Sequence, residues 1–416
     1  MKVLLYGGGA REHALAWKIS QSDILTELYL SKPNDGFAYL GKVLEAQNFE
    51  DLANKSKEIG IDLLVVGPED PLANGIVDAF KKAGIPAIGP DKKWAMLEGS
   101  KSFAKEFMVR NNIPTAGYSL IEDISNIKDV LRNFTAPVVL KADGLAAGKG
   151  VVIAQSLDEA EKVLEDFLGG KYGEASKKVV VEEFLVGEEI SLISLWDGKT
   201  LLPLMPARDY KKLLNNNEGP NTGGMGAYCP VQLNGQEDLE IQDYIKTLET
   251  ALKNEKADFT GIIYSGLIMT KSGIKILEYN MRFGDPETQP LMMHLNSDLL
   301  QIFDMAAKQK LNEVKISWND ELSLCVVIAA KGYPVNPVKG AAIVNIDEIS
   351  KKYGVNIFYA GVKAVNGKLV ANGGRVLSIC KTGNNPSKDI YAAADELIFS
   401  DKYYRADIGG SLCKSL

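Results

Sequence analysis

The sequence predicts a multidomain protein that joins an α/β unit with a parallel sheet to smaller α+β units. Its 416 residues exceed the ~100–200 residues of an ordinary domain, so about two to four domains are expected. Hydrophobic residues make up 46% and charged residues 24% of the chain, which is typical of a globular protein rather than a disordered one. The order of apolar runs and turn-rich segments then indicates where each unit lies.

The first unit, up to about residue 90, alternates short apolar runs with helix-length segments, which is typical of a parallel sheet with crossover helices. The strand-like runs are KVLLY, TELYL, DLLVVG and IPAIG, and the helix-like segments are REHALAWKIS and PLANGIVDAFKKAG. Ligands of such sheets lie beyond the carboxyl ends of the strands. The loops GGGARE and GPED therefore face one crevice.

Gly7, Gly8 and Gly9 stand between a predicted strand and a predicted helix. Backbone N–H groups and the helix dipole bind anions in this setting. A dinucleotide fingerprint beginning at Gly7 needs glycine at position 12, where the chain has Glu12. The cluster is thus an anion site or, as an alternative, a tight turn without a ligand.

The middle of the chain begins with a helical segment from Asp91 to Asn112, which Pro114 closes because proline disfavours helical geometry in the residue before it. A compact α+β unit of the size of a lid follows at about 115–190. It contains VVLK and GVVIA as a strand pair, the helix-like SLDEAEKVLEDFL and the strand VVVEEFL.

The strand pair of this unit is joined by a glycine-rich tip with Gly144, Gly148, Lys149 and Gly150. It is not a Walker loop, because the spacing is one residue short and no Ser or Thr follows the lysine. The tip is expected to close over phosphates while Lys141 supplies charge from the strand. A plain turn is the alternative.

Farther on, residues 215–226 (NNNEGPNTGGMG) are predicted to form a loop, since Gly and Asn favour turns. A final α+β unit follows residue 320. It consists of the strands LCVVIAA, KLVAN and RVLSIC and the helix DIYAAADELIFS.

The strongest chemical signal is the strand GIKILEYN, which begins at Gly273. Because side chains alternate along a strand, Ile274, Ile276, Glu278 and Asn280 are expected to share one face. A carboxylate and an amide oxygen on one face suit Mg2+ bound jointly with phosphates. A solvated strand end is an equally good interpretation of this strand taken alone.

Arg282 continues the same parity and offers a planar cation that can hold a phosphate or carboxylate bidentately. Asp285 and Pro286 are predicted to be the N-cap and first residue of a helix running through Leu291 to Leu295. A substrate role for Asp285 is as well supported as capping.

Net charge, cysteine spacing and the length of the apolar runs argue against several classes of protein. The net charge of −7 argues against nucleic-acid binding by bulk charge. Cys229, Cys325, Cys380 and Cys413 show no metal or redox spacing, which favours a reducing, cytoplasmic compartment. The apolar run Val3 to Tyr6 is too short for a signal peptide, and no run approaches the ~20 residues of a membrane span.

Several of these elements occur in the order typical of the ATP-grasp ligases: Lys101, Lys141, the glycine hairpin, EEFLVGEE, and the strand with Glu278 and Asn280. More narrowly, the chain resembles the phosphoribosylamine–glycine ligases, through GGGAREHALAWK, GPEDPL, SKSFAKEFM, KADGLAAGKGV, EEFLVGEEIS, GPNTGGMGAYCP, LEYNMRFGDPETQ, GGRVL and YRADIG. The resemblance implies an ATP-grasp fold over 101–320, with the lid at about 115–190. A Rossmann-like parallel-sheet domain is implied over 1–100 and a small α+β domain over 321–416.

The resemblance also implies the ATP site. It consists of two phosphate-binding lysines, the hairpin, an adenine-binding hinge, a ribose contact and a pair of Mg2+ or Mn2+ ligands: Lys101, Lys141, Gly144, Gly148, Lys149, Gly150, Glu182, Glu183, Phe184, Leu185, Glu189, Glu278 and Asn280.

The implied substrates are glycine and 5-phosphoribosylamine. The phosphate of the latter would lie at Gly8, Gly9, Ala10, Arg11 and Glu12, and its ribose near Gly67, Pro68 and Glu69. Further substrate contacts would come from Asn221, Thr222, Gly223, Gly224, Asp285, Pro286 and Glu287, and catalytic groups from Arg282, Asp209 and Lys211. Two positions depart from the family pattern: Arg208 replaces a glutamine, and Asn215 to Asn217 replace a stretch richer in Gly and Asp.

The implied reaction is the ATP-dependent formation of glycinamide ribonucleotide through glycyl phosphate. No nucleic-acid or membrane partner is expected, and the chain is expected to be a monomer or weak homodimer. Three alternatives remain open at this point: another ATP-grasp ligase or carboxylase of purine synthesis, a nicotinamide-dependent oxidoreductase, and a nucleotide-binding regulator without turnover.

Overall fold

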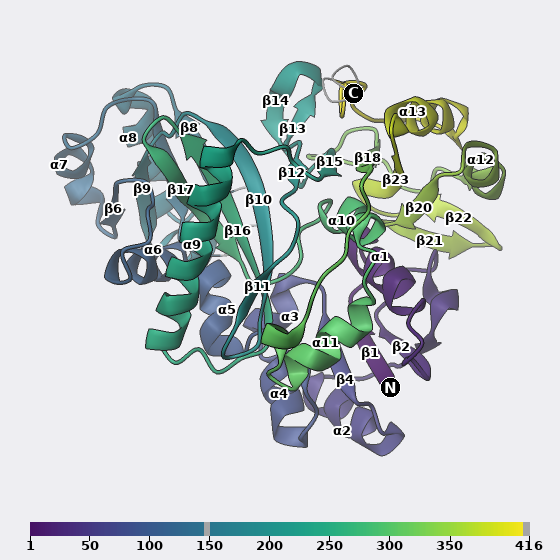
Figure 1. The fold of residues 1–416 in the computed structure, drawn as a ribbon. Helices are drawn as coiled ribbons and strands as arrows, with labels where there is room; N and C mark the ends of the chain where they lie inside the picture. The colour runs from purple at the N-terminus through teal and green to yellow at the C-terminus, as the bar shows by residue number, and fades with distance from the viewer. Residues whose placement is uncertain (145–149, 411–416) are drawn as a thin grey trace.

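The N-terminal part of the chain forms a five-stranded parallel sheet in the order β3-β2-β1-β4-β5. The computed structural model describes residues 1–144 and 150–410. Strand β4 is fully apolar and β1 is apolar and buried after Lys2; both lie in the middle of the sheet, with helices on its two faces (Figure 1). The predicted parallel sheet is confirmed. The bounds are β1 (Lys2–Tyr6), α1 (Ala10–Ile19), β2 (Glu27–Ser31), β3 (Lys42–Val43), α2 (Phe49–Ile59), β4 (Leu63–Val66), α3 (Glu69–Ala73), α4 (Ile76–Ala83) and β5 (Ala87–Ile88).

The lid is a four-stranded antiparallel sheet in the order β6-β9-β7-β8. Helix α8 packs on it through Ala160, Leu164 and Phe167, at the upper left of Figure 1. The expected strand pair is β7 and β8, but Gly148 and Lys149 lie outside the described residues. The bounds are β6 (Tyr118–Ile121), α7 (Ile127–Leu131), β7 (Val138–Ala142), β8 (Val151–Ala154), α8 (Leu157–Leu168) and β9 (Val179–Glu183).

A second antiparallel sheet, in the order β11-β10-β16-β17, forms the centre of the molecule. The helical segment expected from Asp91 to Asn112 is two helices, because Ser100 ends the first in extended geometry and caps the second by accepting a hydrogen bond from Phe103 N. The bounds are α5 (Lys92–Gly99), α6 (Lys101–Arg110), β10 (Glu188–Trp196), β11 (Leu201–Pro203), α9 (Gly235–Asn254), β16 (Gly261–Thr270) and β17 (Gly273–Asn280).

Strand β17 corrects one expectation about the carboxylate strand. Glu278 pairs with Gly266 but Ile276 pairs with Leu267, so Leu277 is an extra residue and the strand is bulged there. The alternation therefore reverses: Tyr279 packs in the same core as Ile274 and Ile276. Glu278 and Asn280 still share a face with each other, but that face is opposite to Ile274 and Ile276.

The C-terminal part forms a third sheet in the order β12-β15-β18-β23-β20, with β25 also pairing with β18. Strands β12 and β15 come from the middle of the chain, so this sheet ties the two regions together. The bounds are β12 (Arg208–Asp209), β15 (Gly226–Cys229), α10 (Thr288–His294), α11 (Leu299–Ala307), β18 (Leu322–Ala330), β19 (Ile343–Val344), α12 (Ile346–Tyr353), β20 (Asn356–Tyr359), β21 (Val362–Val365), β22 (Lys368–Ala371), β23 (Arg375–Gly383), α13 (Pro386–Glu396), β24 (Ile398–Phe399) and β25 (Lys402–Tyr403).

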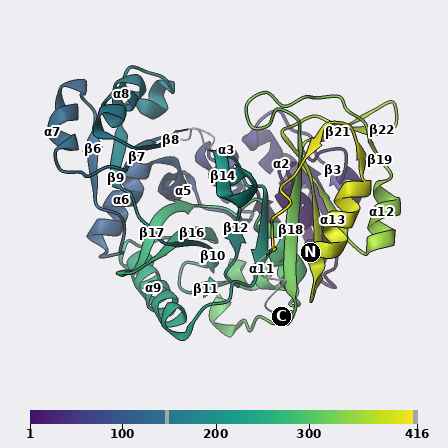
Figure 2. The ribbon, with the colours of Figure 1, turned by 90° about the horizontal axis from the view of Figure 1, so that it is seen from above.

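The segment 215–226 is not a loop throughout. Strand β14 (Glu218–Asn221) pairs with β13 (Lys212–Leu214) as a hairpin, and Gly226 already belongs to β15. The turn is tight because Asn216 and Asn217 adopt positive φ, a conformation that asparagine tolerates. In both views the hairpin lies between the lid side and the C-terminal sheet (Figures 1 and 2).

Within the described part of the chain, no helix is both long enough and apolar enough to cross a membrane.

Gly67, at the end of β4, is expected to resist substitution. A Cβ built there would lie 1.9 Å from Glu12 Oε1, and Glu12 is only 2% exposed, so it has no room to withdraw. Gly67→Ala should lower the free energy of unfolding by about 1–3 kcal/mol through overpacking, measured by urea unfolding. The control Gly235→Ala meets no atom within 4 Å, and an equal loss in both variants would contradict this account.

Candidate active site

The site is built around one carboxylate, Glu278, on the bulged strand. Burial acts to raise the pKa of Glu278, but Lys211, Lys141, Lys101 and Arg282 together outweigh it and lower the pKa. The four cations come from different segments. Lys211 lies at the start of the β13–β14 hairpin and Lys141 in the lid. Lys101 begins α6, and Arg282 follows the end of β17. The structure thus gathers the phosphate-binding and catalytic cations expected from the sequence around the predicted metal ligand.

Lys141 is held in place by the buried carboxylate of Glu182. Glu182 lies 3.0 Å from Lys141 Nζ and 3.2 Å from Lys105 Nζ, and Lys141 Nζ also donates to Leu277 O at 3.0 Å. Glu182 was expected in the adenine hinge, but its side chain is 2% exposed and turned toward these lysines. It orients Lys141, and the exposed part of the hinge begins at the next residue.

Lys105 was not identified from the sequence as a site residue. Its ammonium donates to Thr115 Oγ1 at 2.7 Å and lies 5.5 Å from the centre of the Tyr118 ring. Burial lowers its pKa to about 8. The only sequence signal was its place in the SKSFAKEFM stretch, because its ion-pair partner Glu182 lies on β9, in a different part of the chain.

The hinge itself is open. Glu183 binds Lys275 at 2.8 Å and accepts from Gly117 N at 3.0 Å. A hollow of about 440 Å3 lies between the hinge and the β16–β17 turn, lined by Phe184, Leu185, Val186, Thr270, Lys271 and Ser272. Glu189, the expected ribose contact, lies 2.9 Å from Lys211 Nζ.

Arg208, which replaces the glutamine typical of the family, is tied to the strand that carries Glu189. Its Nε donates to Glu189 O at 2.9 Å, and its Nη2 lies 2.7 Å from Glu188 Oε2. The replacement therefore anchors the start of β10 to β12.

Arg282 is held by protein groups on three sides. It lies 2.9 Å from Glu98 and 3.3 Å from Glu69, and donates to Asn280 Oδ1 at 3.2 Å. Glu98 also accepts from Met281 N and was missed by sequence reasoning, since nothing near it in the sequence indicates a partner. Arg282 thus joins the N-terminal unit, α5 and strand β17, which carries the predicted metal ligands.

The half-buried Asp209 and the buried Glu287 form an acidic pair beside Lys211. Burial raises the pKa of Asp209 to about 7, while Asp209 raises the pKa of Lys211 well above its usual value against the effect of burial. Glu287 accepts from Ser191 at 3.0 Å and Tyr264 at 2.8 Å. This arrangement offers carboxylates and an ammonium next to Glu278.

The glycine crevice is partly filled by Glu12. Its carboxylate accepts from Gly9 N at 2.5 Å and lies 2.6 Å from Arg11 Nε, while its stem packs against Gly7 and Gly67. Glu12 thus caps its own helix. The remaining charges at this end of the sheet are Arg11, whose Nη1 donates to Phe283 O at 3.0 Å, and Glu69.

Asp285 is not the helix N-cap. Helix α10 begins at Thr288, with Glu287 in the cap position and no side-chain cap. Asp285 instead lies 2.8 Å from Arg375 Nη2 and accepts from Gln289 at 2.9 Å. The local capping rule fails because an ion pair with the C-terminal sheet holds the carboxylate elsewhere.

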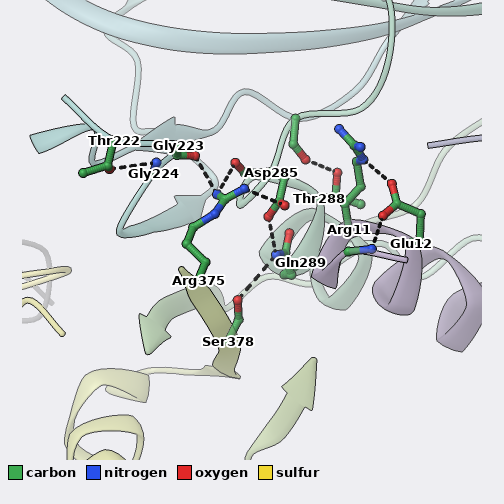
Figure 3. A network of polar contacts seen from close by, with 12 residues as sticks. Arg11, Glu12, Thr222, Gly223, Gly224, Asp285, Thr288, Gln289, Arg375 and Ser378 are labelled. Carbon is green, nitrogen blue, oxygen red and sulfur yellow. Dashed lines mark hydrogen bonds and ion pairs between the residues drawn. The ribbon is translucent and has the colours of Figure 1, made fainter. Parts of the chain in front are cut away.

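Arg375 of β23 links this turn to the Thr222–Gly224 segment (Figure 3). Its Nη1 donates to Gly223 O at 2.6 Å and to Asp285 O at 2.7 Å, and Gly223 N donates to the Tyr333 hydroxyl at 2.9 Å. Sequence reasoning assigned Arg375 no role, although it lies within GGRVL. The C-terminal sheet therefore positions two of the expected substrate segments.

Within residues 1–144 and 150–410, no group of three or more His, Cys, Asp or Glu side chains is arranged to hold a metal ion. Glu278 and Asn280 are a pair of hard oxygen donors, to which other ligands would have to be added.

A lid sheet carrying Lys141 over a second sheet carrying Glu278 defines the class of ATP-grasp proteins. Models of the phosphoribosylglycinamide synthetase N domain, ATP-grasp (A) domain and C domain match residues 1–98, 99–288 and 323–411. The chain belongs to the phosphoribosylglycinamide synthetase family, which confirms the resemblance and the ATP-grasp fold.

The relatives cover nearly the whole chain. A phosphoribosylamine–glycine ligase of Brucella melitensis is 44% identical over 98% of this chain and 97% of its own length, and one of Clostridium acetobutylicum is 42% identical over 99% and 100%. The crystal structure of phosphoribosylamine–glycine ligase from Thermotoga maritima has a TM-score of 0.83 and 32% identity over 98% and 100%. Biotin carboxylase from Campylobacter jejuni, at a TM-score of 0.73 and 14% identity over 99% and 95%, shares the fold.

Lys105 gives the site a measurable pH signature. Its pKa of about 8 lies below the usual 10.5, so between these values the unfolded chain binds the extra proton and stability rises with pH. The unfolding free energy of the wild type minus that of Lys105→Met should be flat below pH 8 and increase from about pH 8 to 10.5. The burial of Lys105 would be contradicted if this free-energy difference fell as the pH rises from about 8 to 10.5. It would also be contradicted if the pH dependence matched that of a variant at an exposed lysine, Lys128→Met.

Proposed function

We propose that the chain joins glycine to 5-phosphoribosylamine at the expense of ATP, giving glycinamide ribonucleotide, ADP and phosphate. The observation that carries this proposal is the group of four cations around the ionised Glu278, next to the crevice at the carboxyl ends of the parallel strands. Full-length identity of 40–44% to phosphoribosylamine–glycine ligases supports the choice of substrates.

ATP lies between the lid and the central sheet in this proposal. Lys101 and Lys141 hold its phosphates, and Gly144 and Gly150 belong to the hairpin that covers them. Glu183, Phe184 and Leu185 border the adenine, while Glu189 faces the ribose. Glu182 contributes indirectly, because its ion pair fixes the Lys141 ammonium.

Glu278 and Asn280 fit a divalent cation, since they present a carboxylate and an amide oxygen on one face of β17. Phosphate oxygens and water would supply the further ligands that a hard cation such as Mg2+ or Mn2+ requires. The cation, when bound, offsets phosphate charge and polarises the γ-phosphoryl group. Arg282 keeps Asn280 oriented toward that position.

The crevice formed by Gly8 to Glu12 and by Gly67 to Glu69 receives phosphoribosylamine. Because Glu12 already accepts from Gly9 N, Arg11 and the other helix-start N–H groups carry the phosphate contact. Thr222–Gly224 and Asp285–Glu287 close the site from the C-terminal side, where Arg375 joins them.

The reaction proceeds in two steps. The glycine carboxylate attacks the γ-phosphorus, the bond to the β-phosphate oxygen breaks, and glycyl phosphate and ADP form. The amine of phosphoribosylamine then attacks the acyl carbon and expels phosphate. Lys211 and Arg282 offset the charge that develops, and Asp209, with its pKa of about 7, is placed to take the amine proton.

The alternatives are weaker. Biotin carboxylases share only the fold at 14–18% identity, and Glu12 fills the space in which a nicotinamide dinucleotide would need close backbone contact.

We place the domain boundaries near residues 100 and 320. A cytoplasmic location and a monomeric or weakly dimeric state remain predictions.

An ADP-release assay tests the proposal directly. ADP should form when glycine, freshly made phosphoribosylamine, ATP and Mg2+ are all present, and omission of either glycine or phosphoribosylamine should abolish sustained turnover. ADP release that requires bicarbonate instead of glycine would favour a carboxylase and overturn the assignment.

Glu278→Gln tests the proposed metal ligand. Loss of the carboxylate should lower kcat/KM for metal-bound ATP by about 100-fold or more, the scale expected for removing a charge-stabilising group. Circular dichroism should show an unchanged fold. Asn280→Asp retains an oxygen donor and should retain more activity, whereas wild-type turnover in Glu278→Gln would rule out the metal role.

A further inference from the structure

The β13–β14 hairpin is an unusual support for catalytic groups, because it has little core of its own. Residues 215–221 are all exposed, and an isolated two-stranded hairpin is only marginally stable in water. Yet Lys211 precedes its first strand and Thr222–Gly224 follow its second. The positions of both therefore depend on whatever holds the hairpin from outside.

Arg405, near the C-terminus, contacts both neighbours of Lys211. Its Nη1 donates to Lys212 O at 3.1 Å, and its guanidinium lies 4.9 Å from the centre of the Tyr210 ring. The same Nη1 donates to Asn217 Oδ1 at 3.1 Å in the hairpin turn. The side chain is 1% exposed, so a charged group about 190 residues away in sequence is buried against this hairpin.

Asp407 fixes the orientation of that guanidinium. Its two oxygens lie 2.8 Å from Arg405 Nε and 2.7 Å from Nη2, a bidentate geometry that defines the plane of the group. Asp407 also accepts from Asn216 N at 2.9 Å, and Ala406 N donates to Asn215 Oδ1 at 3.0 Å. The turn and the ion pair thus form one unit, which we call the Arg405–Asp407 clamp.

The clamp is coupled to the reaction centre through the backbone. Lys211 O accepts from both the N–H and the hydroxyl of Thr222, each at 2.8 Å, so the two ends of the hairpin move together. Lys211 Nζ then reaches Glu189 at 2.9 Å, on the side of Glu278. None of the contacts of Arg405 described above is to a proposed ATP-binding residue.

We infer that Arg405 is a positioning residue for the ligation: with Asp407 it sets Lys211 and the Thr222–Gly224 segment relative to Glu278. This inference rests on the function proposed above. It assigns a role to the C-terminal YRADIG sequence through its contacts with the β13–β14 hairpin.

Steady-state kinetics of Arg405→Met and Arg405→Lys test the inference. In Arg405→Met, kcat should fall about tenfold, equivalent to about 1.4 kcal/mol, while KM for ATP stays within about twofold because the lid lysines and hinge are untouched. Arg405→Lys should recover part of kcat, since its ammonium can pair with Asp407 but cannot form the fork. Unchanged kcat in a folded Arg405→Met would overturn the inference.

Lys381→Met is the matched control for loss of stability. Lys381 pairs with Asp389 within the C-terminal unit and donates to Tyr353 O, and neither partner belongs to the hairpin. The Lys381→Met variant should have a lower melting temperature than the wild type. Its kcat should be unchanged at a temperature where the enzyme is folded. An equal fall in kcat for the two variants at equal stability would assign the effect to general destabilisation and overturn the inference.

A readout independent of turnover is cleavage at Glu218 by a glutamyl endopeptidase. Arg405→Met should be cut at this bond about tenfold faster than the wild type, because the hairpin opens locally more often. Equal rates would contradict the clamp. If the wild type itself released no ADP, the proposed function would fail, while this comparison would still decide whether Arg405 holds the hairpin.

Discussion

The structure depends on a concentration of positive charge around one carboxylate, that of Glu278. Lys101, Lys141, Lys211 and Arg282 converge on Glu278 from four separate segments of the chain. Buried charges are tolerated only when they are paired and hydrogen-bonded, and here Glu182, Asp209, Glu98 and Glu69 supply the partners. The cations are thereby held in fixed positions, where they can stabilise a polyphosphate and the charge that develops on it.

This constraint explains why the site is divided among several units. The lid contributes Lys141, the central sheet contributes Glu278 and Asn280, and the β13–β14 hairpin contributes Lys211. The N-terminal unit joins them through the ion pair of Glu69, the first residue of α3, with Arg282. The C-terminal sheet joins through the ion pair of Arg375 with Asp285. Each unit therefore contributes one segment to the site together with the contact that orients it.

The sequence predicted the features that depend on local pattern. Strands of the parallel sheet, the β7–β8 pair and the shared face of Glu278 and Asn280 follow from apolar periodicity and turn residues. The bulge at Leu277 does not follow from the local sequence pattern, because it depends on how Glu278 pairs with Gly266 of the neighbouring strand. The N-cap predicted at Asp285 was wrong for a similar reason. Its partner Arg375 is 90 residues away in the sequence, so the local pattern does not show the ion pair. The roles of Lys105, Glu98 and Arg405 become apparent only from contacts with residues that are distant in the sequence.

The central claim is that the gathered cations serve to make an acyl phosphate from glycine. The most direct measurement is the transfer of isotope from glycine labelled with 18O in its carboxylate to the phosphate released during turnover. Formation of glycyl phosphate requires one carboxylate oxygen to leave with the phosphoryl group, so the account predicts one 18O in each phosphate from fully labelled glycine. Phosphate free of the label, with ADP and product formed at the normal rate, would contradict it.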